Sequence, residues 1–342
     1  MGENSVLSVI MPVYNAEKYL ADAVGSVLSQ TYKNLEVICV NDCSKDSSLQ
    51  ILTELAKKDS RVKVINSQVN VGAGEARNLG ISAAAGEYIT FIDSDDTIDF
   101  DLYEKACNAT QNGMVDEVVW GICEEYYNKN GDIKKKVCIS PKERTYTDKE
   151  EILKAILSLE DKTIFGYQCN SLYRAEIIKN NKIRFEKSIL YEDFFFNLDF
   201  AKHINSLSCI EYAGYKYAKR SGGSITSRFT KDYYDLSYRR INEMFDFYKE
   251  NYKINKEVYN ILGNRLIRYT LSAICRNFKK ESGMSEKGRK AWFNEICDKP
   301  LYAEILPSCI PKNAVFGILK KAIMNKNTFV AFFVGRVVDL LR

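Results

Sequence analysis

The order of apolar and polar positions predicts the fold of the first third of the chain. Apolar runs at residues 6–11, 35–40, 62–65 and 88–92 recur at spacings of roughly thirty residues, as the βαβ units of a parallel sheet require. Between the first two runs, apolar positions follow one helical stripe. The stripe consists of Tyr19, Leu20, Ala23, Val24, Val27 and Leu28. Parallel sheets bind ligands beyond the carboxyl ends of their strands, so we look for a site in the loops at that edge.

Beyond residue 105 the pattern becomes less regular. Residues 117–122 predict a further strand, 128–132 a hairpin turn, and 148–159 a helix. From residue 232 onward, apolar positions recur at helical spacing. We therefore expect an α/β fold with a doubly wound, mostly parallel sheet, followed by a helical C-terminal region.

Composition narrows the chemistry. The 342 residues are 46% hydrophobic and 27% charged, which is typical of a globular protein. The ten cysteines form no C-x-x-C pair, so they are predicted to be small, reduced core residues of a protein in a reducing cytoplasm. The single histidine, His203, excludes a multi-histidine metal site and favours a carboxylate as any general base.

The two ends of the chain bear on location. The strand predicted at residues 6–11 leaves no room before it for a secretory signal, and the start lacks the Ser or Thr of a myristoylation signal. The sequence contains no run of ~20 apolar residues, so we expect no membrane span. We expect a cytoplasmic protein.

The segment 311–342 is basic and alternates apolar with charged residues at helical spacing. Such a segment would lie on an anionic membrane surface, at the inner face of the cell membrane. Alternatively, it would be a packing helix or a contact in a homo-oligomer. From Ile310 onward, the charged residues are Lys312, Lys320, Lys321, Lys326, Arg336 and Arg342 against Asp339, a net charge of +5.

An acid cluster follows the fourth apolar run. Asp93, Asp95 and Asp96 lie within four residues, and carboxylates at the end of a buried strand repel one another unless a cation lies between them. Hard carboxylate oxygens suit Mg²⁺ or Mn²⁺, which keep open positions for phosphate oxygens. The alternative is that these acids cap the next helix.

Two earlier loops offer groups for a nucleotide base. The stretch Pro12-Val13-Tyr14-Asn15 follows the first apolar run, where proline is expected to end the strand and the aromatic and amide would contact a base. Asp42, after the second run, would accept the imide N–H of a uracil-like base. Ordinary turn chemistry is the alternative for the first loop.

The glycine-containing loop after the third run does not predict a nicotinamide site. Arg77 stands where the third glycine of G-x-G-x-x-G belongs, and the loop follows the third strand instead of the first. Arg77 would instead aim a cation toward the phosphate edge, although an exposed arginine on a helix is usually only solvated.

A second acidic pair lies among aromatic residues. Glu192 and Asp193 precede Phe194-Phe195-Phe196, and apolar surroundings disfavour an ionised carboxylate unless it faces a polar cleft. A partly desolvated carboxylate at a cleft suits a general base; the alternative is that this pair caps the helix starting at Phe194. Residues 215–225 predict a strand and a basic, glycine-rich loop that would fold over a diphosphate, or else a flexible turn.

Together these segments resemble the family 2 inverting glycosyltransferases with the GT-A fold, of the bacterial polysaccharide-biosynthesis type. The resemblance covers residues 7–103 almost continuously, and two later segments extend it. It is carried by Val9-Ile10-Met11-Pro12-Val13-Tyr14-Asn15, Ser26-Val27-Leu28-Ser29-Gln30-Thr31-Tyr32, Glu36 to Asp46, Asn70-Val71-Gly72, Ala76-Arg77-Asn78 and Phe91-Ile92-Asp93-Ser94-Asp95-Asp96. It implies a GT-A domain at residues 1–228, with a nucleotide-binding half at about 1–105 and an acceptor half at about 106–228, and a helical region at 229–342.

The resemblance also implies the roles of the donor-side residues. Asp93-Ser94-Asp95 corresponds to the D-x-D motif, with Asp95 the direct ligand of Mn²⁺ or Mg²⁺ and Asp93 serving the ribose, the sugar or the metal. Pro12 to Asn15 and Asp42 would hold the uridine, and Arg77 would lie near the sugar diphosphate. Asn41 and Cys43 depart from the Asp-Asp or Asp-Gly that the family often has around this position.

On the acceptor side, Asp193 matches the catalytic base of the family's Glu-Asp motif. Glu192 would position Asp193 or touch the acceptor, and Asp96 is left to cap a helix or to support the metal-binding pair from behind. The segment from Tyr215 is similar to the family's Tyr-x-Tyr-Arg-x-x-x-x-Ser pattern, which places Arg220 and Ser224 at the diphosphate.

The expected activity is transfer of a sugar, with inversion, from a nucleotide-sugar to a hydroxyl of a glycan or lipid-linked acceptor in cell-surface polysaccharide synthesis. No nucleic-acid partner is expected. A nucleotidyltransferase is an alternative, but it needs a glycine- and lysine-rich signature after the first strand. A non-catalytic scaffold of a polysaccharide-assembly complex is the other alternative.

Overall fold

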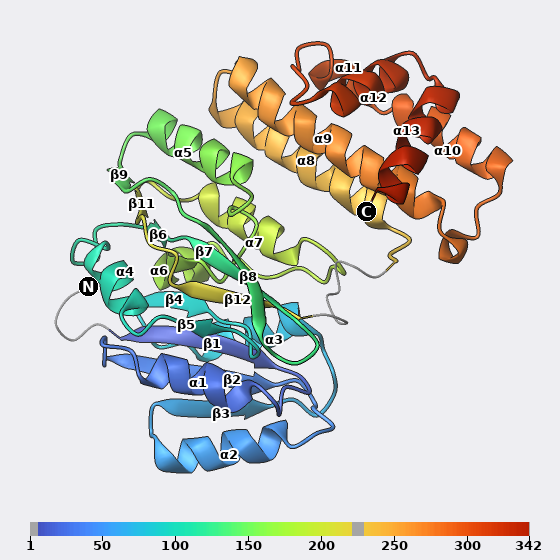
Figure 1. The fold of residues 1–342 in the computed structure, drawn as a ribbon. Helices are drawn as coiled ribbons and strands as arrows, with labels where there is room; N and C mark the ends of the chain where they lie inside the picture. The colour runs from blue at the N-terminus through green and yellow to red at the C-terminus, as the bar shows by residue number, and fades with distance from the viewer. Residues whose placement is uncertain (1–5, 221–228, 342) are drawn as a thin grey trace. The chain divides into compact units, whose positions relative to one another are not determined.

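The computed structural model describes residues 6–220 and 229–341 (Figure 1). The chain forms two compact units, residues 1–224 and 225–342. The domain boundary predicted at residue 228 falls in the stretch that is not described, so the division at 228 remains a prediction.

The main sheet of the first unit is mostly parallel in its first half, as predicted. Its strands are β1 (Leu7–Val13), β2 (Leu35–Asn41), β3 (Val62–Asn66), β4 (Tyr88–Phe91), β6 (Glu117–Val119), β9 (Arg144–Tyr146), β10 (Ser171–Arg174) and β11 (Leu207–Cys209). Their order is β3-β2-β1-β4-β10-β6-β11-β9. The pairs β1–β2, β1–β4 and β2–β3 are parallel, whereas β10 runs antiparallel to β4 and β6. The α/β, doubly wound fold is thereby confirmed.

Helices cover both faces of this sheet, which explains why β1 and β2 are buried along their whole length. The helices of the first unit are α1 (Leu20–Leu28), α2 (Ser48–Lys58), α3 (Ala73–Ala83), α4 (Leu102–Asn108), α5 (Lys149–Asp161), α6 (Ala175–Asn180) and α7 (Glu192–Ala201). Val9 and Met11 of β1 share a core with Leu20 and Ala23 of α1. Ile10, between them, faces the other way and contacts α3 at Gly80, where a Cβ would lie 2.4 Å from the Ile10 side chain.

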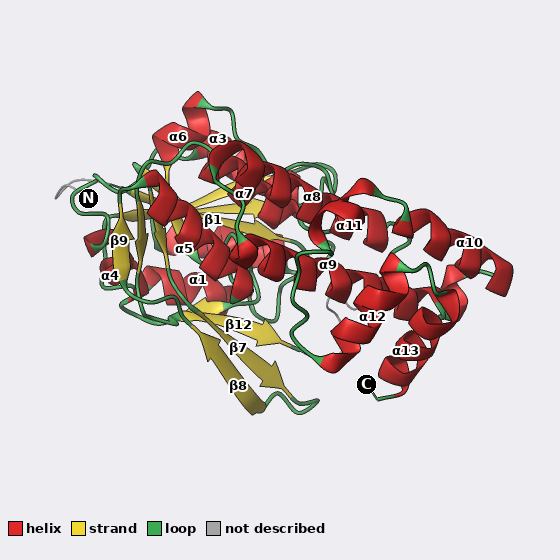
Figure 2. Cartoon of the chain, turned by 90° about the horizontal axis from the view of Figure 1, so that it is seen from above, coloured by secondary structure: helices red, strands yellow, loops and turns green. Residues whose placement is uncertain are grey.

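The first unit also contains a second, smaller sheet, whose first strand follows β4 in the sequence. It consists of β5 (Thr97–Ile98), β12 (Tyr215–Lys219), β7 (Ile122–Tyr127) and β8 (Ile133–Ile139), in that order. Figure 2 shows β12, β7 and β8 side by side. The hairpin predicted at 128–132 joins β7 to β8. The single strand predicted at 117–122 is wrong: the chain leaves the main sheet after Val119 and enters the second sheet at Ile122, so this stretch divides into β6 and β7. Between the two strands, a Cβ at Gly121 would lie 2.4 Å from Ile139 O, so this position has no room for a side chain.

The cysteine prediction is wrong for one pair. Cys123 and Cys138 face each other in the β7–β8 register and form a disulfide. The remaining cysteines form no disulfide, and Cys39, Cys107, Cys169, Cys209, Cys275 and Cys309 are buried as predicted. A hairpin register brings together residues that no short spacing motif marks.

The second unit is helical, as the sequence predicts. It contains α8 (Tyr233–Asn251), α9 (Lys256–Asn277), η2 (Lys280–Ser282), α10 (Glu286–Cys297), α11 (Pro300–Ile305), α12 (Ala314–Met324) and α13 (Thr328–Leu340). The long helix α9 is its centre and contacts α8, α11, α12 and α13. Asn255 caps α9 by accepting hydrogen bonds from the backbone N–H groups of Glu257 and Val258. No helix among the described residues is long and apolar enough to cross a membrane.

Candidate active site

The acid cluster lies directly beyond β4 and divides into three environments. Asp96 is almost fully buried and accepts hydrogen bonds from the Tyr215 hydroxyl and the Ala218 N–H, each at 2.8 Å. Of the two roles expected of Asp96, capping a helix is wrong, because α4 begins only at Leu102 and Asp96 instead anchors β12. Support of the metal-binding pair stays a prediction. Burial and the charges of Asp93 and Asp95 raise the pKa of Asp96 well above its ordinary value.

Asp93 and Asp95 are more open. Asp93 is partly exposed and its N–H donates to the Tyr215 hydroxyl (3.2 Å), while Ser94 lies half-buried between the two acids. The Asp95 side chain is 50% exposed. Burial of the surrounding site and the Asp93 charge raise the pKa of Asp95, and Arg220 opposes that rise. Neighbouring carboxylates repel each other in this way, and a cation bound between them would relieve the repulsion.

Arg77 joins this cluster to the second acidic pair. It lies on α3 with only 4% of its surface exposed. The alternative that Arg77 is a solvated surface arginine is therefore wrong. Its Nη2 donates to Asp93 Oδ1 at 2.9 Å and its Nη1 to Asp193 Oδ1 at 3.2 Å. Glu192 Oε1 lies 4.0 Å from the same Nη1. Burial lowers the pKa of Arg77, but Asp193 and Asp93 outweigh it, so the pKa is raised and the guanidinium stays charged.

Asp193 and Glu192 occupy the first turn of α7. Neither caps this helix, because α7 begins at Glu192 and its N-cap position is Tyr191. The aromatic residues that follow anchor the helix: Phe196 stacks on Phe185 at 4.2 Å between ring centres and contacts Phe91 of β4 edge-on. Burial raises the pKa of the Asp193 carboxyl to about 8, although Arg77 works in the opposite direction.

Gln168 is a site residue that the sequence did not reveal. It is 1% exposed, and in the amide orientation that satisfies both neighbours it donates to Asp193 Oδ2 (2.9 Å) and accepts from Arg77 Nη2 (2.7 Å). It lies in irregular chain just before β10, without a motif or periodicity around it. Only the folding of that segment against α7 and α3 brings it to the carboxylate.

The loop after β1 differs in part from the prediction. β1 continues through Pro12 to Val13, both buried. Proline has no N–H to donate, but at Pro12 the nitrogen faces β4, and the pairing of β4 with β1 stops at Ile10. The pairing of β1 with β2 on the other side therefore continues through Pro12. Tyr14 is 49% exposed. Asn15 accepts a hydrogen bond from the Lys45 N–H at 2.7 Å, which ties this loop to the one after β2.

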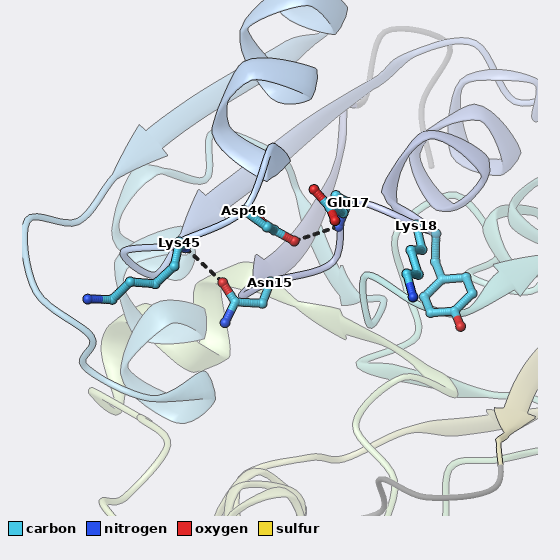
Figure 3. A pocket seen from close by; sticks show the side chains of 6 residues that line it. Asn15, Glu17, Lys18, Lys45 and Asp46 are labelled. Atoms are coloured by element: carbon cyan, nitrogen blue, oxygen red, sulfur yellow. Dashed lines mark hydrogen bonds between the residues drawn. The ribbon is translucent and has the colours of Figure 1, made fainter.

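A pocket of about 500 Å³ opens between these two loops (Figure 3). Its lining consists of Asn15, Glu17, Lys18, Tyr19, Lys45 and Asp46. The Asp46 carboxylate accepts from the Glu17 N–H at 3.0 Å and fixes one wall. Lysine, amide and aromatic groups at this sheet edge suit a nucleotide.

Asp42 has a structural role that was not predicted. It is 3% exposed, and its two carboxylate oxygens accept from the N–H groups of Val71 (2.6 Å) and Gly72 (2.9 Å). Gly72 has φ +89°, a backbone conformation that residues with a side chain rarely adopt. Asp42 therefore holds the loop before α3, and any contact with a base uses its remaining lone pairs. Its role toward the base stays a prediction.

Arg220 reaches the acid cluster from the end of β12. Its Nη1 donates to Asp95 O at 2.8 Å and to Asp95 Oδ2 at 3.3 Å, and its guanidinium lies 3.9 Å from the centre of the Tyr19 ring. Arg220 therefore contacts both Tyr19, which lines the pocket, and Asp95. Ser224, predicted to accompany it, lies outside the described residues.

The donor set suits a divalent cation that is completed by substrate. No group of three His, Cys, Asp or Glu side chains in the described part of the chain could enclose a metal by itself. Asp95, with Asp93 beside it, offers hard oxygens at an open position, and Mg²⁺ or Mn²⁺ commonly takes its other ligands from phosphate oxygens and water.

Comparisons with known proteins agree with this architecture. The sequence profile of Glycosyl transferase family 2 matches residues 8–181. EpsH of Bacillus subtilis (strain 168), whose name assigns it provisionally as a glycosyltransferase, is 33% identical over 313 residues, which cover 89% of this chain and 86% of EpsH.

Two solved structures show the same fold. The crystal structure of S. aureus TarS 1–349 in complex with UDP-GlcNAc has a TM-score of 0.67 and 23% identity, covering 98% of this chain and 92% of that one. The mannosyltransferase PcManGT from Pyrobaculum calidifontis, in complex with GDP-Man and Mn²⁺, has a TM-score of 0.50 and 14% identity, covering 99% of this chain and 88% of that one. The chain belongs to glycosyl transferase family 2: it is a glycosyltransferase with the GT-A fold.

Proposed function

We propose that this enzyme transfers a sugar, with inversion, from a UDP-sugar to a hydroxyl of a glycan or lipid-linked acceptor in cell-surface polysaccharide synthesis. The observation that carries the proposal is the contact of one buried guanidinium, that of Arg77, with both Asp93 and Asp193. It joins the acids of the donor side to the carboxylate proposed as base. The UDP-GlcNAc held by TarS supports uridine as the donor nucleotide.

In the proposed reaction Asp193 acts as the general base. Its carboxylate accepts the proton of the acceptor hydroxyl while the hydroxyl oxygen forms a bond to the anomeric carbon. The bond from that carbon to the diphosphate oxygen breaks, and its electron pair leaves with the diphosphate. One displacement inverts the anomeric centre, and no covalent sugar–enzyme intermediate is required.

The donor-side residues bind and orient the leaving group. Arg220 and Arg77 supply positive charge on either side of the Asp93–Asp95 pair. Mn²⁺ or Mg²⁺ held by Asp95, with Asp93, would neutralise charge on the diphosphate. The Mn²⁺ of the mannosyltransferase neighbour supports that choice of cofactor. The nucleoside is proposed to occupy the region of Tyr14, Asn15 and Asp42.

Substituting Asp193 and Asp95 one at a time distinguishes the role of the general base from that of the metal ligand. A panel of UDP- and GDP-sugars with Mn²⁺ first identifies the donor by its hydrolysis. Asp193→Asn should then abolish transfer while leaving Mn²⁺-dependent UDP binding by calorimetry intact. Asp95→Ala should weaken that binding.

Asp199→Asn is the matched control for Asp193→Asn. Asp199 lies on the same helix, but its side chain is 44% exposed and pairs with Lys202 at the surface. This variant should transfer sugar normally. Near-normal transfer by Asp193→Asn would refute the base assignment and leave the metal assignment standing.

A further inference from the structure

Exposed apolar side chains are concentrated at the end of the second unit. Of the seventeen large hydrophobic residues exposed in the described parts of the chain, nine lie from Ile310 onward. They are Ile310, Val315, Ile318, Met324, Phe329, Phe333, Val337, Leu340 and Leu341. Exposed apolar groups gathered in this way usually mark a contact surface.

Helix α13 is apolar on two opposite sides. Its inner side is fixed in the unit: Gly335 lies so close to Ile274 of α9 that a Cβ would come within 2.5 Å of that side chain. Phe332 contacts the rings of Phe278 and Phe293. The neighbouring Phe333 points outward and is 64% exposed. The packing of this inner side therefore determines which residues of α13 are exposed among the described parts of the chain.

The outer stripe of α13 has regular helical spacing. Phe329, Phe333, Val337 and Leu340 follow one another at intervals of four, four and three residues, and Phe329 and Leu340 are 81% and 86% exposed. The preceding helix α12 packs beside α13 (Figure 2). On α12, Val315 and Ile318 are exposed as well. We define the outer face as these six residues.

The outer face is bordered by positive charge. α12 contains no acidic residue and α13 contains only Asp339. Lys321 lies one turn after Ile318, and its side-chain ammonium has no hydrogen-bond or ion-pair partner among the described residues. Arg336 lies between Phe333 and Val337, with its guanidinium 3.9 Å from the centre of the Phe278 ring. Apolar side chains are thus presented together with unneutralised basic groups.

We propose that the outer face of α12 and α13 binds the surface of an anionic membrane. The apolar side chains would enter the boundary between headgroups and acyl chains, and the basic residues would meet the lipid phosphates. A second copy of the chain fits less well, because a two-fold interface would bring the two sets of basic residues together. This binding does not depend on the proposed transfer chemistry.

Flotation with phospholipid vesicles tests the proposal on the full chain without any donor. The wild type should float with vesicles of phosphatidylcholine and phosphatidylglycerol, and much less with phosphatidylcholine alone. Phe333→Ala should lower the partition coefficient roughly tenfold, as expected for one phenylalanine removed from an apolar environment. Lys321→Glu should lower binding to the anionic vesicles and leave the weak binding to neutral ones unchanged.

Phe100→Ala is the matched control. Phe100 is also 64% exposed, but it lies in the first unit, outside the outer face and outside the proposed active site. It should float like the wild type, and circular dichroism should show that all variants are folded. Absence of wild-type flotation, or equal losses for Phe333→Ala and Phe100→Ala, would overturn the proposal. So would a dimer in sedimentation velocity that Phe333→Ala converts to monomer while vesicle binding is unaffected.

Discussion

At the scale of single residues, the site depends on one buried cation that is shared by acids from different parts of the chain. Arg77 is closest to Asp93 and Asp193, which are separated by a hundred residues of sequence. Buried charges are tolerated only when they are paired and hydrogen-bonded, and Gln168 completes this requirement for Asp193. Burial raises the pKa of Asp193, Arg77 opposes that rise, and the charges of Glu192 and Asp93 add to it.

This arrangement predicts a pH dependence for transfer. The base must be ionised, and burial raises the pKa of Asp193 to about 8, so kcat/KM should increase with pH until about that value. Gln168→Leu removes a hydrogen bond to the ionised form, so the Asp193 pKa should rise further and the acid limb should move to higher pH. At pH 7, below the pKa of Asp193, the rate should fall about tenfold or more, because a hydrogen bond to a charged group contributes roughly 1.5–3 kcal/mol and its loss raises the pKa by about one to two units.

The measurement is a pH–rate profile of both proteins with a fixed donor and acceptor. Gln111→Leu is a suitable control, because Gln111 makes a surface contact with Thr145 away from the site. A Gln168→Leu profile whose acid limb coincides with that of the wild type would show that Gln168 does not act on Asp193.

At the scale of elements, α3 is positioned by its contact with β1. Gly80 lets the helix approach Ile10, and the same helix carries Arg77 into the site. The precision of the Arg77 contacts therefore depends on a residue three positions further along α3. α7 is held in a comparable way by the stacking of Phe196 on Phe185.

Two glycine substitutions should have opposite effects on stability. Gly80→Ala places a methyl group 2.4 Å from the Ile10 side chain, and overpacking of this kind costs about 1–3 kcal/mol. Gly25→Ala on α1 meets nothing within 4 Å, so it should stabilise the protein by about 0.5–1 kcal/mol through helix propensity. Urea denaturation measures both. Equal stability of the two variants would contradict the close contact between α3 and β1.

At the scale of the whole molecule, the two units have different roles in our proposals. Donor binding is assigned to the loops of the first unit, and lipid binding to α12 and α13 of the second. Each role can therefore be examined while the other is left intact.

Hydrogen exchange should show this separation. On addition of UDP and Mn²⁺, we expect slower exchange in the loops at residues 12–15, 41–46 and 93–96, because a bound ligand suppresses their local opening. The amides of α12 and α13 should exchange at unchanged rates. Asp95→Ala should abolish the protection, and protection confined to the second unit would argue against donor binding at Asp95.

Much of the fold and part of the site could be predicted from the sequence. Apolar runs at regular spacing determine buried parallel strands, and the ends of those strands determine which loops share an edge. The positions of Asp93, Asp95 and Asp193 in motifs therefore led to the family, which the comparisons confirm. Local patterns sufficed because each strand, and each loop after it, is short and continuous in sequence.

The pairings between distant segments were decided only by the tertiary structure. The sequence did not show that Arg77 bridges two acids, that Gln168 completes the pair, that Asp96 anchors β12, or that Cys123 meets Cys138. It also left open whether the tail was packed or exposed, because its apolar residues point both ways around the helix. Burial and charge pairing are properties of neighbours in space, and only the folded chain brings those neighbours together.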